Sequence, residues 1–198
     1  MHDYADYWWN NEAGMAASVP EKDYFHLVTE GIKKHEEDVT SYAYSFITWE
    51  TLASDRAETL CLIDKYLSDK LDLVTIQLGE NATDLSTFES DFEYLISYIK
   101  DKAPNASIYV IGDVWSYEDR DEQKEKAAKE MNVTYISFDE IKDNTDYQAG
   151  LGTTVYGDDG VGHTIEHNGV ARHPGDKGME YIANKILDVI YPDNEDNL

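Results

Sequence analysis

Residues 73–79 read Leu-Val-Thr-Ile-Gln-Leu-Gly, a short apolar run that stops at a glycine, and residues 107–112 repeat the pattern as Ser-Ile-Tyr-Val-Ile-Gly. Short apolar runs of this kind are typical of parallel strands that are buried on both faces of a sheet. Between them, apolar side chains recur at helical spacing through residues 87–102, and Pro104 follows. A strand, a helix and a second strand in this order predict a parallel sheet with helices packed on it.

The same alternation continues outward along the chain. Hydrophobic spacing predicts strands at residues 39–46 and 133–138, and helices at residues 21–32, 56–67, 119–131 and 176–190. Residues 145–174, which are rich in glycine and histidine, are expected to form a long loop. We therefore predict an α/β fold with helices on both faces of a parallel sheet. It forms a single domain over residues 1–192, with an acidic tail at residues 193–198.

Composition narrows the classes of partner. The chain of 198 residues carries 41 acidic and 16 basic side chains, a formal charge of −25, which disfavours nucleic acid and anionic membrane surfaces. No apolar stretch approaches the length of a membrane span, and the start of the chain lacks the pattern of a signal peptide. A cytoplasmic protein is therefore expected, with a signal peptide upstream of Met1 as the alternative that the sequence leaves open. The single cysteine, Cys61, excludes an internal disulfide, and its apolar neighbours predict a packed, unreactive thiol.

Two segments lie where parallel sheets bind ligands, beyond the carboxyl ends of their strands. Gly79-Glu80-Asn81 directly follows the first run, and an asparagine there can donate its amide N–H to an oxyanion or merely cap the turn. His173 precedes the last predicted helix, where an imidazole can act as a general base or serve the structure alone. Spacing by itself leaves both alternatives open.

Together these segments resemble the SGNH/GDSL hydrolase family. Residues 79–81 look like its third block, and residues 173–179, His-Pro-Gly-Asp-Lys-Gly-Met, look like its fifth block. Residues 8–18, Trp-Trp-Asn-Asn-Glu-Ala-Gly-Met-Ala-Ala-Ser, are similar to the segment that follows the nucleophile loop in a bacterial branch of the family. The resemblance covers nearly the whole chain in the correct order.

The resemblance implies a three-layer α/β/α, flavodoxin-like domain and hydrolysis of a carboxylic ester, with a short acyl group on a sugar or other small alcohol. In it, His173 is the base, and Asn81 with Gly79 belongs to the oxyanion site. Trp8, Trp9 and Glu80 are expected to line the substrate site. No cofactor or metal is implied. The attacking serine and the first strand are expected to lie before Met1.

Several positions depart from the family pattern. Val170 stands where the triad acid is usual, so Glu166, Asp159 or a backbone carbonyl is left to orient His173. A clear second-block glycine is missing after residues 39–46, and Ser45 is a possible substitute donor. Ser18 is a weak substitute for the nucleophile, because its small neighbours suggest a packed turn.

Two rival interpretations come from other classes of protein. The loop before the last helix contains imidazoles and carboxylates, the usual ligands of a metal site. They are His163, His167, His173, Asp158, Asp159 and Glu166. The glycines among them argue against the helix that would bring His163 and His167 onto one face. The other rival is a degenerate, non-catalytic family member that binds a carbohydrate or another small ligand through its many aromatic side chains.

Overall fold

The computed structural model describes residues 14, 16–157 and 160–192. Its contacts divide the chain into two compact units, one formed by residues 42–142 and the other by residues up to 41 together with residues from 143 on. The expectation of one domain over residues 1–192 stays a prediction.

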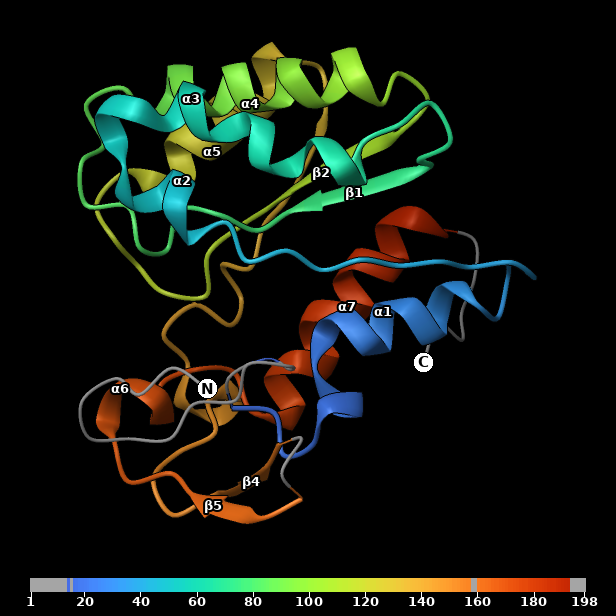
Figure 1. Ribbon diagram of the computed structural model, residues 1–198. Coiled ribbons are helices and arrows are strands. Elements are labelled where there is room, and N and C mark those ends of the chain that lie inside the picture. The colour runs from blue at the N-terminus through green and yellow to red at the C-terminus, as the bar shows by residue number, and fades with distance from the viewer. Residues whose placement is uncertain (1–13, 15, 158–159, 193–198) are drawn as a thin grey trace. The chain divides into compact units, whose positions relative to one another are not determined.

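The unit of residues 42–142 is built on a three-stranded parallel sheet. Strands β1 (Leu73–Ile76), β2 (Ser107–Ile111) and β3 (Thr134–Ile136) lie in the order β1-β2-β3. Val74 pairs with Ile108, and Val110 pairs with Tyr135. Helices α4 (Phe88–Lys102) and α5 (Arg120–Glu130) make the two crossovers, and Figure 1 shows α4 running along the sheet. The structure thereby confirms the prediction of an α/β fold with a parallel sheet.

The core of this unit forms where α4 packs on the strands and on the short helices α2 (Ile47–Thr51), α3 (Arg56–Thr59) and the 3-10 helix η3 (Leu60–Tyr66). At its centre the rings of Trp49, Phe88 and Phe92 lie 5.4–5.8 Å apart. Buried aliphatic side chains complete it: Leu60, Ile63, Ile76, Leu95, Ile96, Ile99, Ile108 and Val110. The apolar side chains from which α4 and β2 were predicted are therefore the ones that are buried in the core.

The other unit packs helix α1 (Tyr24–Ile32) against helix α7 (Asp176–Ile190). Gly31 permits the close approach, since a Cβ there would lie 2.4 Å from a Leu187 methyl group. Strands β4 (Thr154–Tyr156) and β5 (Gly162–Thr164) form an antiparallel hairpin, followed by α6 (Asn168–Ala171). Single 3-10 turns, η1 (Pro20–Lys22) and η4 (Thr145–Tyr147), complete the unit.

The helix predicted over residues 56–67 continues from α3 into the 3-10 geometry of η3. A 3-10 helix has three residues per turn, so Leu60 and Ile63 share its buried side while Cys61 points outward. The prediction of a packed thiol at Cys61 is therefore wrong, because it assumed the apolar run to be buried all round.

Two further predictions about local structure are wrong. The strand predicted over residues 39–46 is not formed: no strand among the described residues pairs with it, and the side chains of residues 40–45 are exposed. The long loop predicted over residues 145–174 contains the β4–β5 hairpin and α6, whose elements are only three or four residues long. Among the helices described, none is long and apolar enough to cross a membrane.

Candidate functional site: the turns beyond β1 and β2, and His173

The turn that follows β1 requires a glycine. Gly79 has φ +116°, in the region that side chains rarely adopt, and a Cβ there would lie 2.8 Å from Cζ of Phe88. Three residues beyond the end of β1, this conformation begins a turn that contains Glu80 and Asn81 and is closed by a 2.8 Å hydrogen bond from the N–H of Ala82 to the carbonyl oxygen of Gly79. The sequence prediction of a sharp glycine turn at this edge is confirmed.

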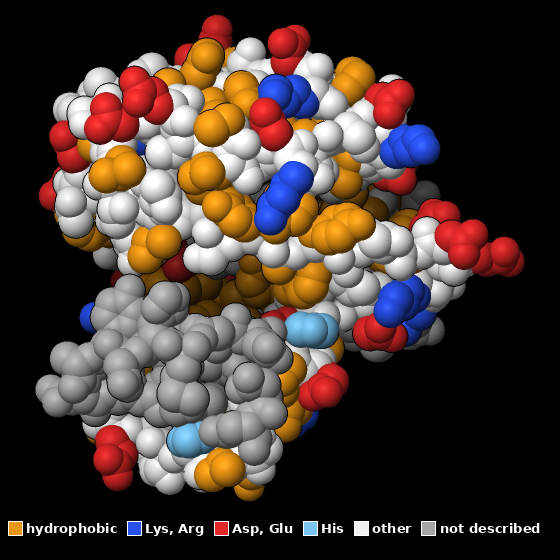
Figure 2. Space-filling model, in the orientation of Figure 1, with side chains coloured by type: hydrophobic (Ala, Val, Ile, Leu, Met, Phe, Trp, Pro, Cys, Tyr) orange, Lys and Arg blue, Asp and Glu red, His pale blue; other side chains and the backbone are white. Residues whose placement is uncertain are grey.

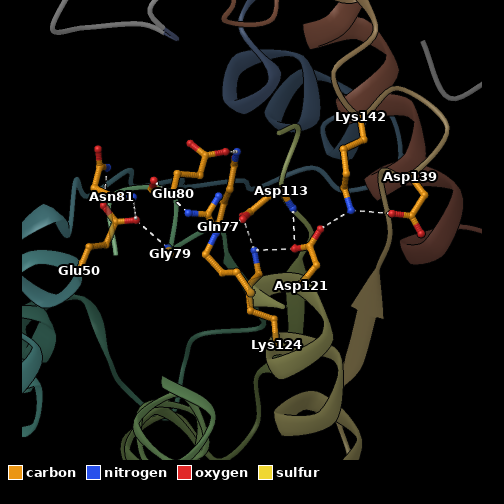
Figure 3. A network of polar contacts seen from close by, with 11 residues as sticks. Glu50, Gln77, Gly79, Glu80, Asn81, Asp113, Asp121, Lys124, Asp139 and Lys142 are labelled. Atoms are coloured by element: carbon orange, nitrogen blue, oxygen red, sulfur yellow. Dashed lines mark hydrogen bonds and ion pairs between the residues drawn. The ribbon is translucent and has the colours of Figure 1, made fainter. Parts of the chain in front are cut away.

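A buried carboxylate, Glu50 of α2, holds this turn. Its Oε1 accepts the N–H of Gly79 at 2.6 Å, and its Oε2 accepts the side-chain Nδ2 of Asn81 at 2.7 Å. The backbone N–H of Asn81 also points to Oε1, at 3.5 Å. Figure 3 shows Glu50 facing the turn from the side of α2. The side-chain amide of Asn81 thus has one N–H bound to Glu50, and the N–H of Gly79 is fully used.

A second buried charge cluster follows β2. Asp113 is 1% exposed and accepts hydrogen bonds from Nε of Arg120 and, at 2.7 Å, from Nζ of Lys124. Both cations come from α5 and are almost inaccessible to water. Charges are buried only where partners compensate them, so the three side chains are a mutually dependent set. Arg120 also donates to the carbonyl oxygen of Glu80 at 3.1 Å, which ties the turn after β1 to the cluster after β2.

The cluster extends outward along the same edge. Asp121 accepts the backbone N–H of Asp113 at 2.9 Å and pairs with Lys142 at 2.6 Å, and Lys142 pairs in turn with Asp139 beyond β3. These contacts run across the carboxyl ends of all three strands (Figure 3). The edge of the sheet that parallel folds use for ligands is therefore also the edge where this unit concentrates its buried charge.

Glu80 is a half-buried carboxyl group on this edge. Burial is the largest cause that raises the pKa of Glu80 to about 7, and the negative charge of Asp113 raises it further. Lys124 acts in the opposite direction, and Gln77 donates a long hydrogen bond to Oε1 of Glu80 at 3.4 Å. Near neutral pH this side chain is consequently present in both forms, and it can accept or donate a hydrogen bond.

His173 lies in the other unit, between α6 and α7. Its Nδ1 makes a hydrogen bond of 2.8 Å to the carbonyl oxygen of Gly169. A carbonyl only accepts, so Nδ1 carries the proton and Nε2 is the acceptor nitrogen of the neutral ring. Burial lowers the pKa of His173, against the opposing effect of its hydrogen bonds with the backbone of Gly169 and Val170. The group that binds Nδ1 is thus a backbone carbonyl. It is one of the three alternatives for orienting His173 that the sequence left open, besides Glu166 and Asp159.

The remaining candidates for the triad acid and the nucleophile are placed as follows. Val170 is buried in an apolar cluster, and Glu166 is exposed on the segment before α6. Ser18 donates its Oγ and its N–H to the carboxylate of Asp176, each at 2.7 Å. Hydrogen bonding of Ser18 to a carboxylate at the start of α7 fits the packed turn expected for it.

The predicted site residues fall into three groups. Gly79, Glu80 and Asn81 lie together in the unit of residues 42–142, as does Ser45, which is exposed on the extended segment before α2. His173 lies in the other unit. Trp8, Trp9 and Asp159 are outside the described residues.

Four residues of the site were not predicted from the sequence: Glu50, Asp113, Arg120 and Lys124. A signal for Asp113 exists, because it follows the glycine at the end of a buried run as Glu80 does. Arg120 and Lys124 stand four residues apart on a largely polar helix. The one signal for their burial is that they share a helical face with the two buried alanines, Ala127 and Ala128.

For the metal alternative, within the described ranges no group of three or more His, Cys, Asp or Glu side chains is arranged to hold a metal ion. Comparison with known proteins finds no matching family model and no curated relative of this chain.

Proposed function

We propose that this chain is a carboxylic ester hydrolase of the SGNH/GDSL class, with a flavodoxin-like α/β/α arrangement, that removes short acyl groups from a sugar or another small alcohol. The observation that carries the proposal is the hydrogen bond from Nδ1 of His173, which lies between α6 and α7, to the carbonyl oxygen of Gly169 in α6. It sets the tautomer that a general base needs, with Nε2 as the proton acceptor. Burial lowers the pKa of His173, which favours that neutral form at physiological pH.

The proposed reaction is acyl transfer through a serine. The serine oxygen attacks the ester carbonyl while Nε2 of His173 takes its proton. The same nitrogen then gives the proton to the departing alcohol, and water repeats the sequence on the acyl-serine. Asn81 donates a side-chain N–H to the oxyanion. Gly79 contributes the shape of the turn, because its N–H is bound to Glu50. In the resemblance the serine falls before Met1, and no cofactor takes part.

Charge supports the proposed class of ligand. A formal charge of −25 repels phosphate backbones and anionic lipid surfaces, whereas a neutral acylated sugar is unaffected by it. We accordingly propose a small-molecule substrate and neither a nucleic-acid partner nor a membrane partner. The cytoplasmic location stays a separate proposal, on which the charge does not bear.

The test begins with the DNA upstream of the Met1 codon and with hydrolysis of p-nitrophenyl acetate by the product of the natural gene. An in-frame apolar strand ending in Gly-Asp-Ser or Gly-Asn-Ser is the expected finding. His173→Ala should then lower kcat/KM about 10²–10⁴-fold, the usual contribution of a general base. The acid limb of the wild-type pH profile should lie below the ordinary histidine value of about 6.5, because burial lowers the pKa of His173.

The matched control is His35→Ala, which removes an imidazole that is exposed and stacks on Tyr191. It should leave turnover within about twofold, as expected for a surface change away from the site. Unchanged turnover in His173→Ala would reject the base assignment, and no turnover by the natural gene product would reject the proposed function.

A non-catalytic carbohydrate-binding role is the second candidate, and one observation favours it. The ring of Tyr66 lies 5.8 Å from the ring of Tyr42 and 5.5 Å from the ring of Tyr44. Tyr42 is 64% exposed and Tyr44 is 41% exposed. Exposed aromatic rings can stack on sugars. Titration with a neutral oligosaccharide distinguishes the two roles. If the wild type binds the oligosaccharide but hydrolyses no ester, and Tyr42→Ala abolishes the binding, the result supports a carbohydrate-binding role over an ester hydrolase.

A further inference from the structure

Glu50 has an unusual set of partners for a glutamate on a short helix. The side chain belongs to a residue only 6% exposed, yet both of its oxygens are directed to one three-residue turn. All three N–H groups that it meets come from Gly79 and Asn81. A buried carboxylate needs such donors, and hydrogen bonds to a charged acceptor are stronger than neutral ones.

These contacts fix the orientation of the Asn81 amide. A side-chain amide can present either its oxygen or its nitrogen to a neighbour, but an ionised carboxylate only accepts. Nδ2 therefore faces Oε2 of Glu50, and the second Nδ2–H is directed away from Glu50. On the other side of the turn, Arg120 holds the carbonyl oxygen of Glu80. The turn is thereby held from α2 and from α5 at once.

We propose that Glu50 is a positioning residue for the oxyanion donor: it holds the Asn81 amide so that its second N–H meets the oxyanion. This inference rests on the proposed function and deepens it. Glu50 does not touch the substrate, and it acts through Asn81. Preorganised donors matter because an amide already held in place needs no reorganisation when charge develops on the substrate.

The first test needs no activity. In the wild-type chain, NMR should detect a coupling across the hydrogen bond from Nδ2 of Asn81 to the carboxylate carbon of Glu50. Glu50→Gln should then move the Asn81 side-chain amide resonances, because the introduced amide presents a donor to a donor. The matched control, Glu58→Gln, neutralises an exposed glutamate of α3 and should leave them in place. Absence of the coupling in the wild type overturns the proposal.

The second test uses ester turnover by the natural gene product. Glu50→Gln should lower kcat about 10-fold or more and leave KM within about twofold, since a full oxyanion donor contributes about 10²–10³. In an Asn81→Ala background the same substitution should have much less effect, because a residue that acts through Asn81 has little left to position. A purely structural role predicts equal effects in both backgrounds, and that result overturns the proposal. A wild type that shows the coupling but no turnover rejects the proposed function and leaves the contact itself established.

Discussion

Asp113 faces two cations, Arg120 and Lys124, in a place where all three side chains are 3% exposed or less. Each carboxylate oxygen of Asp113 binds one of the cations: Oδ2 accepts a hydrogen bond from Arg120, and Oδ1 accepts one from Lys124. Transfer of such charges out of water is costly, and removing one partner leaves the others uncompensated. The ion pair with Asp113 is therefore what allows Lys124 of α5 to be fully buried.

Asp113→Asn should consequently lower the free energy of unfolding by about 3–5 kcal/mol, the range for a buried pair that loses one partner. Urea denaturation followed by circular dichroism measures it. Asp119→Asn removes an exposed carboxylate just before α5 and is the matched control, expected within about 0.5 kcal/mol of the wild type. Equal stabilities of the two variants would show that the cluster is solvated.

Glu80 makes stability depend on pH in a defined direction. Its pKa is raised from 4.5 to about 7, so the folded state holds this proton where the unfolded chain has lost it. Stability from this group is therefore full below pH 4.5 and falls as pH rises to about 7. Glu80→Gln should remove that fall and stabilise the protein above pH 7 by roughly 2–3 kcal/mol.

Unfolding free energies of the Glu80→Gln variant and the wild type at several pH values test this. Glu125→Gln, on the exposed side of α5, is the control and should leave the slope of the wild type unaltered. A variant with the same slope as the wild type between pH 4.5 and 7 would mean that Glu80 titrates as an exposed group.

At the scale of the element, the first turn of α7 is tied to the segment before α1. Asp176 accepts from Ser18 and, at 2.7 Å, from Lys22, while its position complements the positive end of the helix. Burial acts to raise the pKa of Asp176, but the hydrogen bonds from Lys22 and Ser18 outweigh it, and the pKa is lowered. The carboxylate therefore remains charged well below neutral pH.

Asp176→Asn should destabilise the protein by about 1–2 kcal/mol, a value reduced because Lys22 and Asp176 are both partly exposed. Thermal unfolding at neutral pH measures it. Glu180→Gln, on the exposed face of the same helix, is expected to change the midpoint little. A shift no larger than that of the control would indicate that water replaces Ser18 and Lys22 without loss.

The longer helices and the buried strands were predictable from the sequence, including the polar helix α5, which matches its predicted bounds of residues 119–131 to within a residue. Short elements fixed by their partners were not. Helix α7 matches its predicted bounds of residues 176–190, and α4 and β2 match to within a residue. The segment at residues 39–45 has strand-like residues, but no strand in the described part of the chain pairs with it. Short runs of three residues, as in β4 and β5, carry too few alternations to show a period.

The site divides in the same manner. The glycine turn at Gly79 was predictable, because it follows from a single position at the end of a strand. Glu50 was not, since its role depends on a contact across about thirty residues of sequence. The group that orients His173 was not predictable either. It is the carbonyl oxygen of Gly169, which lies within hydrogen-bonding distance because residues 168–171 form helix α6.

At the scale of the molecule, acidic side chains outnumber basic ones by 41 to 16. Many of the cations are engaged locally, as Arg56 is with Asp91 and Lys102 with Asp64. On the face shown in Figure 2, acidic side chains are scattered among neutral and apolar ones, and lysines and arginines are fewer. Uncompensated negative charge repels itself in the folded state more than in the expanded one.

Salt should therefore stabilise this protein at neutral pH. Raising sodium chloride from about 20 mM to about 300 mM shortens the screening length from roughly 20 Å to roughly 6 Å, which weakens repulsion between separated carboxylates more than it weakens the buried pairs. We expect the thermal midpoint to rise by a few degrees, equivalent to about 1 kcal/mol. Near the isoelectric point of about 4.3, where net repulsion vanishes, the same addition should have little effect or the opposite one. A midpoint that falls with salt at neutral pH would mean that the ion pairs, and not the excess charge, dominate the electrostatic free energy of folding.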